Sequence, residues 1–282
     1  MSTPLSDLLQ PTRLIEVADI GANSVDGDPP YKALLDVNLC RVTGFEPQAH
    51  AFAELEARSH ANERFLPYAI GDGKPQTLNI CSASGMSSLY EPDAKALEVF
   101  AVLKETAMVV ERIPFTTYKL DDVSEISDLD FLKIDVQGSE LAVFQNGRNK
   151  LSQAVAIQTE VSFVNLYQNQ PSLGDIDTEL RQQGFIPHCF AAVKQCPIAP
   201  CIINNNPRQP LRQLLEADLV YVKDFTRPEL MDDEQLKRLA LIAHYCYGSF
   251  DLALRCIMLL EQRSVMVTGS QARYLQFASK PN

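Results

Sequence analysis

Residues 13–23 read RLIEVADIGAN, and this stretch indicates the class of fold. The run up to Ile20 is apolar and β-branched, which predicts a buried strand, and Gly21 breaks that strand. Asp19 places a carboxylate at the strand end. In an open α/β sheet, ligands bind in the crevice outside the carboxyl ends of the strands. We therefore take this end of the predicted strand as the start of a candidate site.

Strand and helix patterns alternate after this stretch. The Pro29-Pro30 pair suits the start of a helix over 31–39, because proline is tolerated in the first helical turn. A strand over 41–46, a helix over 49–58 and a strand over 65–70 follow. This alternation predicts a parallel sheet covered by helices. Further strands are predicted over 77–83, 110–120, 128–136, 154–163 and 185–193, helices over 92–104, 138–147 and 175–184, and a last antiparallel strand over 217–225.

The C-terminal part of the chain has a helical pattern instead. Residues 226–282 predict a helical hairpin, with Ser249 as an N-cap, packed on a sheet domain formed by residues 1–225. Its apolar stripes are typical of core packing. A contribution to an acceptor pocket or to a homodimer contact is the alternative. The stripes are Leu236, Leu239 and Ile242, and Leu252, Ile257 and Leu260.

Composition excludes several classes of protein. Hydrophobic residues make up 46% and charged residues 22% of the 282 residues, which excludes a disordered tail, a collagen-like fibre and a coiled coil. The net charge of −11 repels phosphate backbones, so we expect no nucleic-acid partner. His244, Asp251 and Arg255 interrupt the most apolar late stretch, so no membrane span is predicted.

The cysteines and the first residues of the chain bear on its location. The seven cysteines form no C-x-x-C pair, and no histidine stands beside them at the spacing of a zinc site. No metal site is predicted. The first residues show no basic segment followed by an apolar one, so a secretion signal is not expected. Free thiols in a reducing compartment, and hence a cytoplasmic location, are the expectation.

Acidic residues stand at the ends of five successive predicted strands. They are Asp19, Glu46, Asp72, Asp135 and Glu160. Any one of them could be a solvated or helix-capping carboxylate, but strand-end acids share one rim of the sheet, which favours a site. A carboxylate at Glu46 can accept both hydroxyls of a ribose, and one at Asp72 could accept an adenine amino hydrogen.

Two other motifs are less informative. DPPY at 28–31 resembles the motif that amino-methyltransferases use to hold a target nitrogen, but it does not follow an apolar strand. We interpret it as a helix start. The loop SASGMSS at 82–88 could cradle a phosphate through backbone amides or form a mobile rim, but no lysine follows it at P-loop spacing.

Taken together, four segments resemble the FkbM-type family of S-adenosylmethionine-dependent methyltransferases. They are VADIGAN (17–23), GFEP (44–47), LKIDVQGSE (132–140) and TEVSF (159–163). The resemblance covers roughly residues 13–190. It implies a class I methyltransferase fold, a Rossmann-like sheet of seven strands whose last strand is antiparallel. It also implies S-adenosylmethionine as cofactor and methylation of a hydroxyl on a glycan or a small-molecule natural product.

The resemblance assigns roles to individual residues. Asp19, Gly21 and Asn23 match the first cofactor loop, beside the methionine part. Glu46 matches the acid that binds the ribose, and Asp72 the contact to adenine. Asp135 matches the fourth-strand acid on the sulfonium side. Two departures stand out, namely Gln137, where the family usually has glutamate, and the unusual loop ANSVDGDPP at 22–30.

Transfer of a methyl group to a hydroxyl needs a nearby base that takes up the proton. Glu160 and His188 are candidates, with Asp135 as the neighbouring strand-end acid. His188 could equally be a satisfied core histidine, and Glu160 could bind a substrate hydroxyl or cap a helix. Tyr167 could line the acceptor pocket or simply pack.

Two alternative functions remain open from the sequence. A nicotinamide-dependent oxidoreductase would also place Glu46 on a ribose. The sequence lacks the three-glycine fingerprint of such enzymes, however, and Tyr118 and Lys119 are adjacent rather than in a Tyr-x-x-x-Lys pair. A non-catalytic binding module that retained the fold is the second alternative.

Overall fold

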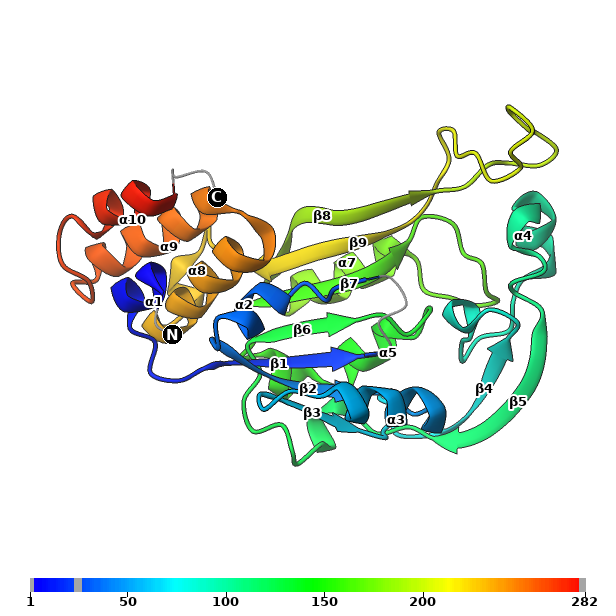
Figure 1. Ribbon diagram of the computed structural model, residues 1–282, viewed down its shortest axis with the longest axis horizontal. Coiled ribbons are helices and arrows are strands. Elements are labelled where there is room, and N and C mark those ends of the chain that lie inside the picture. The colour runs from blue at the N-terminus through cyan, green and yellow to red at the C-terminus, as the bar shows by residue number, and fades with distance from the viewer. Residues whose placement is uncertain (1–2, 23–26, 279–282) are drawn as a thin grey trace.

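A seven-stranded sheet forms the centre of the computed structural model, which describes residues 3–22 and 27–278 (Figure 1). The strand order is β3-β2-β1-β6-β7-β9-β8. Strand β9 is antiparallel to both its neighbours, and the other pairs are parallel. The predicted class I methyltransferase fold is confirmed. The strands are β1 (Ile15–Ile20), β2 (Cys40–Phe45), β3 (Glu63–Leu66), β6 (Phe131–Ile134), β7 (Ala156–Ser162), β8 (Phe185–Gln195) and β9 (Leu214–Lys223).

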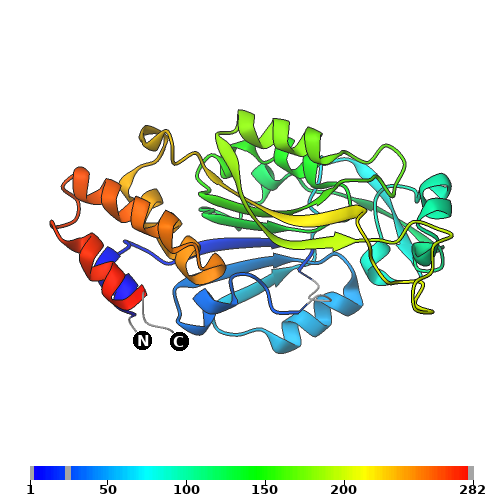
Figure 2. The same cartoon turned by 90° about the horizontal axis from the view of Figure 1, so that it is seen from above.

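Helices cover both faces of this sheet. Alternate residues of each strand point to opposite faces, so each face carries apolar side chains that the helices bury. Val17 and Phe131 pack in a cluster with α2 (Lys32–Asp36) and α8 (Asp233–Tyr247). Leu132, the next residue in β6, packs with α5 (Glu140–Gln145), α6 (Arg148–Leu151) and α7 (Leu173–Gln182). Figure 2 shows α7 and α3 (Ala49–Arg58) on opposite sides of the sheet.

A separate hairpin lies beyond the carboxyl ends of the parallel strands (Figure 1). Its strands, β4 (Pro75–Cys81) and β5 (Val109–Thr116), pair antiparallel and do not join the main sheet. The segment between them holds a 3-10 turn at Ser84–Met86, α4 (Ala94–Val99) and a second 3-10 turn at Ala101–Leu103, whereas the sequence predicts one helix over 92–104. The hairpin therefore projects from the edge of the sheet where ligands are expected to bind.

The C-terminal part contains three helices rather than the predicted hairpin. After α8 and α9 (Phe250–Gln262), α10 (Ser270–Ala278) packs on α9, and α1 (Pro4–Leu9) contacts α10. Ser249 precedes α9, but its side chain makes no capping hydrogen bond. The C-terminal helices lie at the end of the molecule opposite the β4–β5 hairpin (Figure 1). The predicted apolar stripes are buried in the core.

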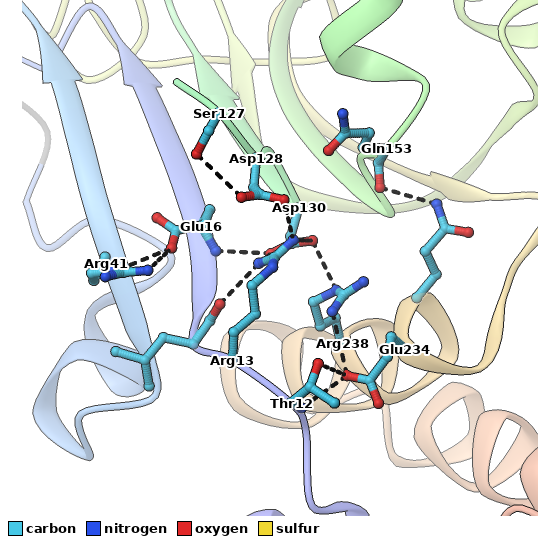
Figure 3. Close-up of polar contacts among 12 residues, drawn as sticks. Thr12, Arg13, Glu16, Arg41, Ser127, Asp128, Asp130, Gln153, Glu234 and Arg238 are labelled. Carbon is cyan, nitrogen blue, oxygen red and sulfur yellow. Dashed lines mark hydrogen bonds and ion pairs between the residues drawn. The ribbon is translucent and has the colours of Figure 1, made fainter. Parts of the chain in front are cut away.

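A buried ion-pair network ties α8 to the amino ends of β1 and β6 (Figure 3). Arg13 pairs with both carboxylate oxygens of Asp130, which is fully buried, and Arg238 Nε lies 2.8 Å from Asp130 Oδ1. Glu234 accepts hydrogen bonds from the backbone N–H and the hydroxyl of Thr12, at 2.9 and 2.7 Å. Helix α8 is therefore joined to the sheet by polar contacts as well as by the apolar core.

No helix in residues 3–22 and 27–278 has both the length and the apolar character that are needed to cross a membrane.

Candidate active site

A cavity of about 660 Å³ lies at the carboxyl ends of the parallel strands. Gly21 lines it at the end of β1, Glu46 and Gln48 line it after β2, and Asp135 and Gln137 line it after β6. The segment between β4 and α4 contributes Ser82 to Ser87. This volume is within the range of pockets that take cofactors and small ligands, about 300–1,000 Å³.

Gly21 allows the turn after β1 to lie against the turn after β6. Its φ is +77°, and a Cβ built on it would lie 2.0 Å from the carbonyl oxygen of Asp135. The backbone N–H of Asp135 in turn donates to the Ile20 carbonyl at 3.0 Å. The cavity floor is therefore backbone, and only a residue without a side chain fits at this position.

Glu46 is buried directly after β2. Its Oε1 accepts from the backbone N–H of Gln48 at 2.8 Å, and Oε2 has no hydrogen-bond partner among the described residues. Burial raises the pKa of Glu46, as does Asp19, whereas the Gln48 hydrogen bond and Lys133 lower it. One carboxylate oxygen thus remains for a donor inside the cavity.

Asp19 faces the side of the sheet covered by α2 and α8. The Tyr31 hydroxyl donates to its Oδ2 at 2.6 Å, and Lys133 Nζ lies 3.3 Å from its Oδ1. Lys133 also donates to the Gly21 carbonyl at 3.1 Å. Burial lowers the pKa of Lys133, but Asp19 and Asp135 raise it above its ordinary value. Asp19 lines a separate cavity of about 330 Å³, and Asn23 lies outside the described residues.

Asp72 does not line the main cavity. Its Oδ1 accepts from the backbone N–H of Lys74, in its own turn, at 3.1 Å and from the hydroxyl of Thr117, directly after β5, at 3.2 Å. The residues of this segment that do line the cavity are Tyr68, Ala69 and Ile70. The structure therefore brings the adjoining segment, rather than the Asp72 carboxylate, to the main cavity.

Three carboxylates meet where β6 and β7 end. Oxygens of Asp135, Glu140 and Glu160 lie within 4.8 Å of one another. Gln137 Nε2 donates to Asp135 Oδ1 and to Glu160 Oε2, both at 2.8 Å. Glu140 Oε1 accepts from the backbone N–H groups of Val136 and Gly138, at 3.0 and 3.2 Å. Of the three acids, only Asp135 lines the main cavity, and Glu160 lies behind it.

Crowding of these acids perturbs their titration. Burial raises the pKa of Glu160 well above its ordinary value, and Asp135, Glu216 and Glu140 add to this effect, while Lys194 opposes it. Burial is also the largest effect on Glu140 and raises its pKa to about 7, although its backbone hydrogen bonds lower it. Glu140 thus exchanges its proton close to neutral pH, and both carboxyl groups keep their protons to a higher pH than is usual for glutamate.

Lys194 on β8 and Glu216 on β9 form the other side of the acidic region. Lys194 Nζ lies 2.8 Å from Glu216 Oε1 and 3.6 Å from Glu160 Oε1, and both Lys194 and Glu216 line the cavity. They are partners in the antiparallel register of β8 and β9. Sequence reasoning missed both residues, because only the pairing of those strands brings them to the site.

His188 and Tyr167 are not brought to the cavity. His188 Nε2 lies 2.7 Å from the Ser249 hydroxyl, in the turn between α8 and α9. Burial lowers the pKa of His188, and the negative charge of Asp251 offsets only part of this effect. Tyr167 is buried and donates from its hydroxyl to the Met86 carbonyl at 3.0 Å, where it supports the 82–88 loop from behind. Neither side chain lines the cavity.

Comparison with known families identifies this arrangement. The family model of the methyltransferase FkbM domain matches residues 19–187. The chain belongs to the FkbM methyltransferase family. It is therefore an S-adenosylmethionine-dependent methyltransferase, which sets aside the oxidoreductase and the non-catalytic module. No curated protein matches the chain.

Several solved structures are similar to this FkbM-family methyltransferase. Magnesium protoporphyrin IX methyltransferase from Synechocystis PCC 6803, with bound S-adenosylmethionine, is 12% identical with a TM-score of 0.37, over 75% of this chain and 71% of that one. Precorrin-6y C5,15-methyltransferase from Geobacter metallireducens GS-15 is 12% identical with a TM-score of 0.37, over 78% and 85%. The 23S rRNA methyltransferase ErmE is 10% identical with a TM-score of 0.32, over 98% and 96%.

The residues present fit the cofactor of this family. Glu46 Oε2 is an acceptor without a partner among the described residues, as a ribose hydroxyl requires. The backbone floor at Gly21 leaves space that a side chain would fill. Acidic groups at Asp135 and Glu216 suit the positive charges of S-adenosylmethionine.

Proposed function

We propose that this FkbM-family methyltransferase methylates a hydroxyl oxygen of a sugar, a glycan or a small-molecule natural product. The observation that carries the proposal is one continuous cavity with Glu46 at the end of β2 and Asp135, Lys194 and Glu216 at the ends of β6, β8 and β9. The Glu46 region suits a nucleoside, and the charged region suits a polar acceptor.

The cofactor roles follow from these positions. Glu46 would hold the ribose through Oε2, and Gly21 would let the methionine part approach the backbone. Asp19 would act indirectly, because its contacts to Tyr31 and Lys133 hold the turn that contains Gly21. Asp135 would face the sulfonium side of the cofactor.

The acceptor would bind between Asp135 and the Lys194–Glu216 pair. When bound, the cofactor supplies a methyl group on a positively charged sulfur. Asp135 would take up the proton that the acceptor hydroxyl releases as its oxygen accepts the methyl group. The protein also aligns the acceptor and excludes water. Glu160, joined to Asp135 through the Gln137 amide, supports this carboxylate from behind.

An acceptor screen tests the proposal. The full chain is incubated with S-adenosylmethionine carrying a labelled methyl group and with panels of hydroxylated glycosides, hydroxylated macrolactones, amines and RNA. Mass spectrometry then locates the label. We expect a methyl ether from a hydroxyl acceptor, and loss of at least about 100-fold in kcat with Asp135→Asn. Methylation of nitrogen, or of RNA in preference to all hydroxylated small molecules, would contradict the proposed acceptor class.

The matched control for this screen is Glu229→Gln, which changes an exposed carboxylate at the opposite end of the molecule. It should leave kcat unchanged.

A further inference from the structure

Glu160 is a buried carboxylate with too few donors for a stable negative charge. Glu160 is only 4% exposed, and the side-chain amide of Gln137 donates one hydrogen bond to its Oε2. Its Oε1 has no hydrogen-bond donor among the described residues, and the Lys194 ammonium lies 3.6 Å away. A buried carboxylate oxygen without a donor favours the protonated form.

The charges around Glu160 are mostly of the same sign. Three acids face Glu160, namely Asp135 at the end of β6, Glu140 on α5 and Glu216 on β9. Lys194 on β8 is the only cation of this set, and it also pairs with Glu216. Tyr167, from the loop after β7, contributes a neutral hydroxyl. An additional positive charge inside the cavity would therefore stabilise the ionised form of Glu160.

Glu140 differs from Glu160 in a way that separates their roles. Two backbone N–H groups donate to Glu140 Oε1 and stabilise its ionised form, which offsets part of the effect of burial whether or not a ligand is present. Within the described part of the chain, no backbone N–H donates to the Glu160 carboxylate. The charge state of Glu160 thus depends most on what the cavity holds.

We propose that Glu160 exchanges a proton for the positive charge of the cofactor. Glu160 is protonated when the cavity is empty or holds S-adenosylhomocysteine, and it is ionised when S-adenosylmethionine is bound. This inference rests on the proposed binding of the cofactor in the main cavity. It makes Glu160 a positioning residue that distinguishes the substrate form of the cofactor from the product form by charge.

The proposal keeps the charge of the site constant during the reaction. The positive charge on sulfur is lost when the carbon–sulfur bond breaks, and the acceptor hydroxyl releases one proton as the carbon–oxygen bond forms. The carboxylate cluster takes up this proton, first on Asp135 and then on Glu160, and Glu160 keeps it until the next S-adenosylmethionine binds. No other reactant is needed.

Proton linkage gives the sign of the expected effect. Binding that releases a proton becomes stronger as the pH rises, so the ratio of the Kd for S-adenosylmethionine to the Kd for S-adenosylhomocysteine should fall by up to about tenfold per pH unit below the pKa of Glu160 in the product complex. The ratio should become constant at a pH above the pKa of Glu160 in the product complex.

Calorimetry measures this exchange without turnover. The full chain is titrated at several pH values with S-adenosylmethionine, S-adenosylhomocysteine and sinefungin, an unreactive analogue with an ammonium in place of the methylsulfonium, in buffers of different ionisation enthalpy. We expect the two charged ligands to release up to one proton each and S-adenosylhomocysteine to release almost none. Glu160→Gln should abolish the difference between the ligands, while Glu140→Gln and Glu229→Gln should retain it.

Lys194 provides a second variant that does not alter Glu160 itself. Lys194→Met removes the cation that opposes protonation of Glu160, so proton release should occur at a higher pH than in the wild type. Lys194→Arg keeps the positive charge and should restore the pH range of the wild type. Equal proton release for all three ligands, or release that persists in Glu160→Gln, would overturn the proposal. If none of the ligands binds, the proposed cofactor site itself is wrong.

Discussion

The carbonyl oxygen of Asp135 lies 2.0 Å from the place where a Cβ on Gly21 would stand. The turn after β1 therefore lies directly against the turn after β6, and both turns line the main cavity. The close approach of the two backbones shapes the floor of the cofactor site.

Gly21→Ala should therefore disturb both stability and cofactor binding. The new Cβ would meet backbone, which cannot rotate away, and the φ of +77° is unfavourable for alanine. We expect a loss of about 1–3 kcal/mol in the free energy of unfolding and weaker binding of S-adenosylmethionine. Urea unfolding and calorimetry measure the two effects. Gly174→Ala is the control, because a Cβ at that position would meet only Ser172 Oγ at 3.5 Å, an ordinary contact distance, and Gly174 does not line the main cavity. It should lower neither the stability nor the affinity for the cofactor.

Glu46→Ala should weaken binding of the cofactor without a comparable loss of stability. It removes a carboxylate that would accept hydrogen bonds from the ribose, each worth about 1.5–3 kcal/mol when one partner is charged. The Kd for S-adenosylmethionine should rise by about 10- to 100-fold in calorimetry. A variant that binds as tightly as the wild type would show that the ribose lies elsewhere, and Glu229→Gln controls for the general loss of negative charge.

Glu140 should make the protein less stable as the pH rises toward neutrality. Its pKa in the folded protein is raised to about 7, so the folded state holds a proton that the unfolded state releases at lower pH. This stabilisation is complete below the pKa of the unfolded state and is lost as the pH rises through the pKa of the folded state. Between about pH 4.5 and pH 7.5, the wild type should lose up to about 3 kcal/mol relative to Glu140→Gln. Urea unfolding at several pH values measures this difference, and parallel curves for the two proteins would contradict it.

Arg238→Ala should destabilise the protein through Asp130. The substitution leaves the fully buried Asp130 with Arg13 as its remaining cation, and the loss of a charged contact costs about 1.5–3 kcal/mol. Thermal unfolding should show a lower Tm. Arg273→Ala, which alters an exposed arginine of α10, is the control and should have little effect.

Removal of residues 226–282 tests the predicted division of the chain. Helix α8 shares one apolar cluster with Val17 and Phe131 of the sheet, so its loss would expose the core. We expect residues 1–225 to lose cooperative unfolding and near-ultraviolet circular dichroism. A truncated chain that unfolds cooperatively would show instead that the sheet forms an independent domain.

Much of the fold was predictable because local patterns agree with the tertiary structure. Apolar and β-branched runs predict β1, β2, β6 and β7 near their observed positions, and the last strand is antiparallel as expected. The third predicted strand, over 65–70, is β3 at Glu63–Leu66, which ends before Pro67. Helix α10 was missed, since its short amphipathic segment gains most of its stability from packing.

The sequence by itself determined the class of fold, the family and the acids at the strand ends, because these depend on residue types at local spacings. Only the tertiary structure decided which side chains share the cavity. It turns Asp19 toward Tyr31 and Lys133, holds Asp72 beside Thr117 and leaves His188 beside Ser249. It also brings in Lys194 and Glu216, since they meet through strand pairing rather than through proximity along the chain.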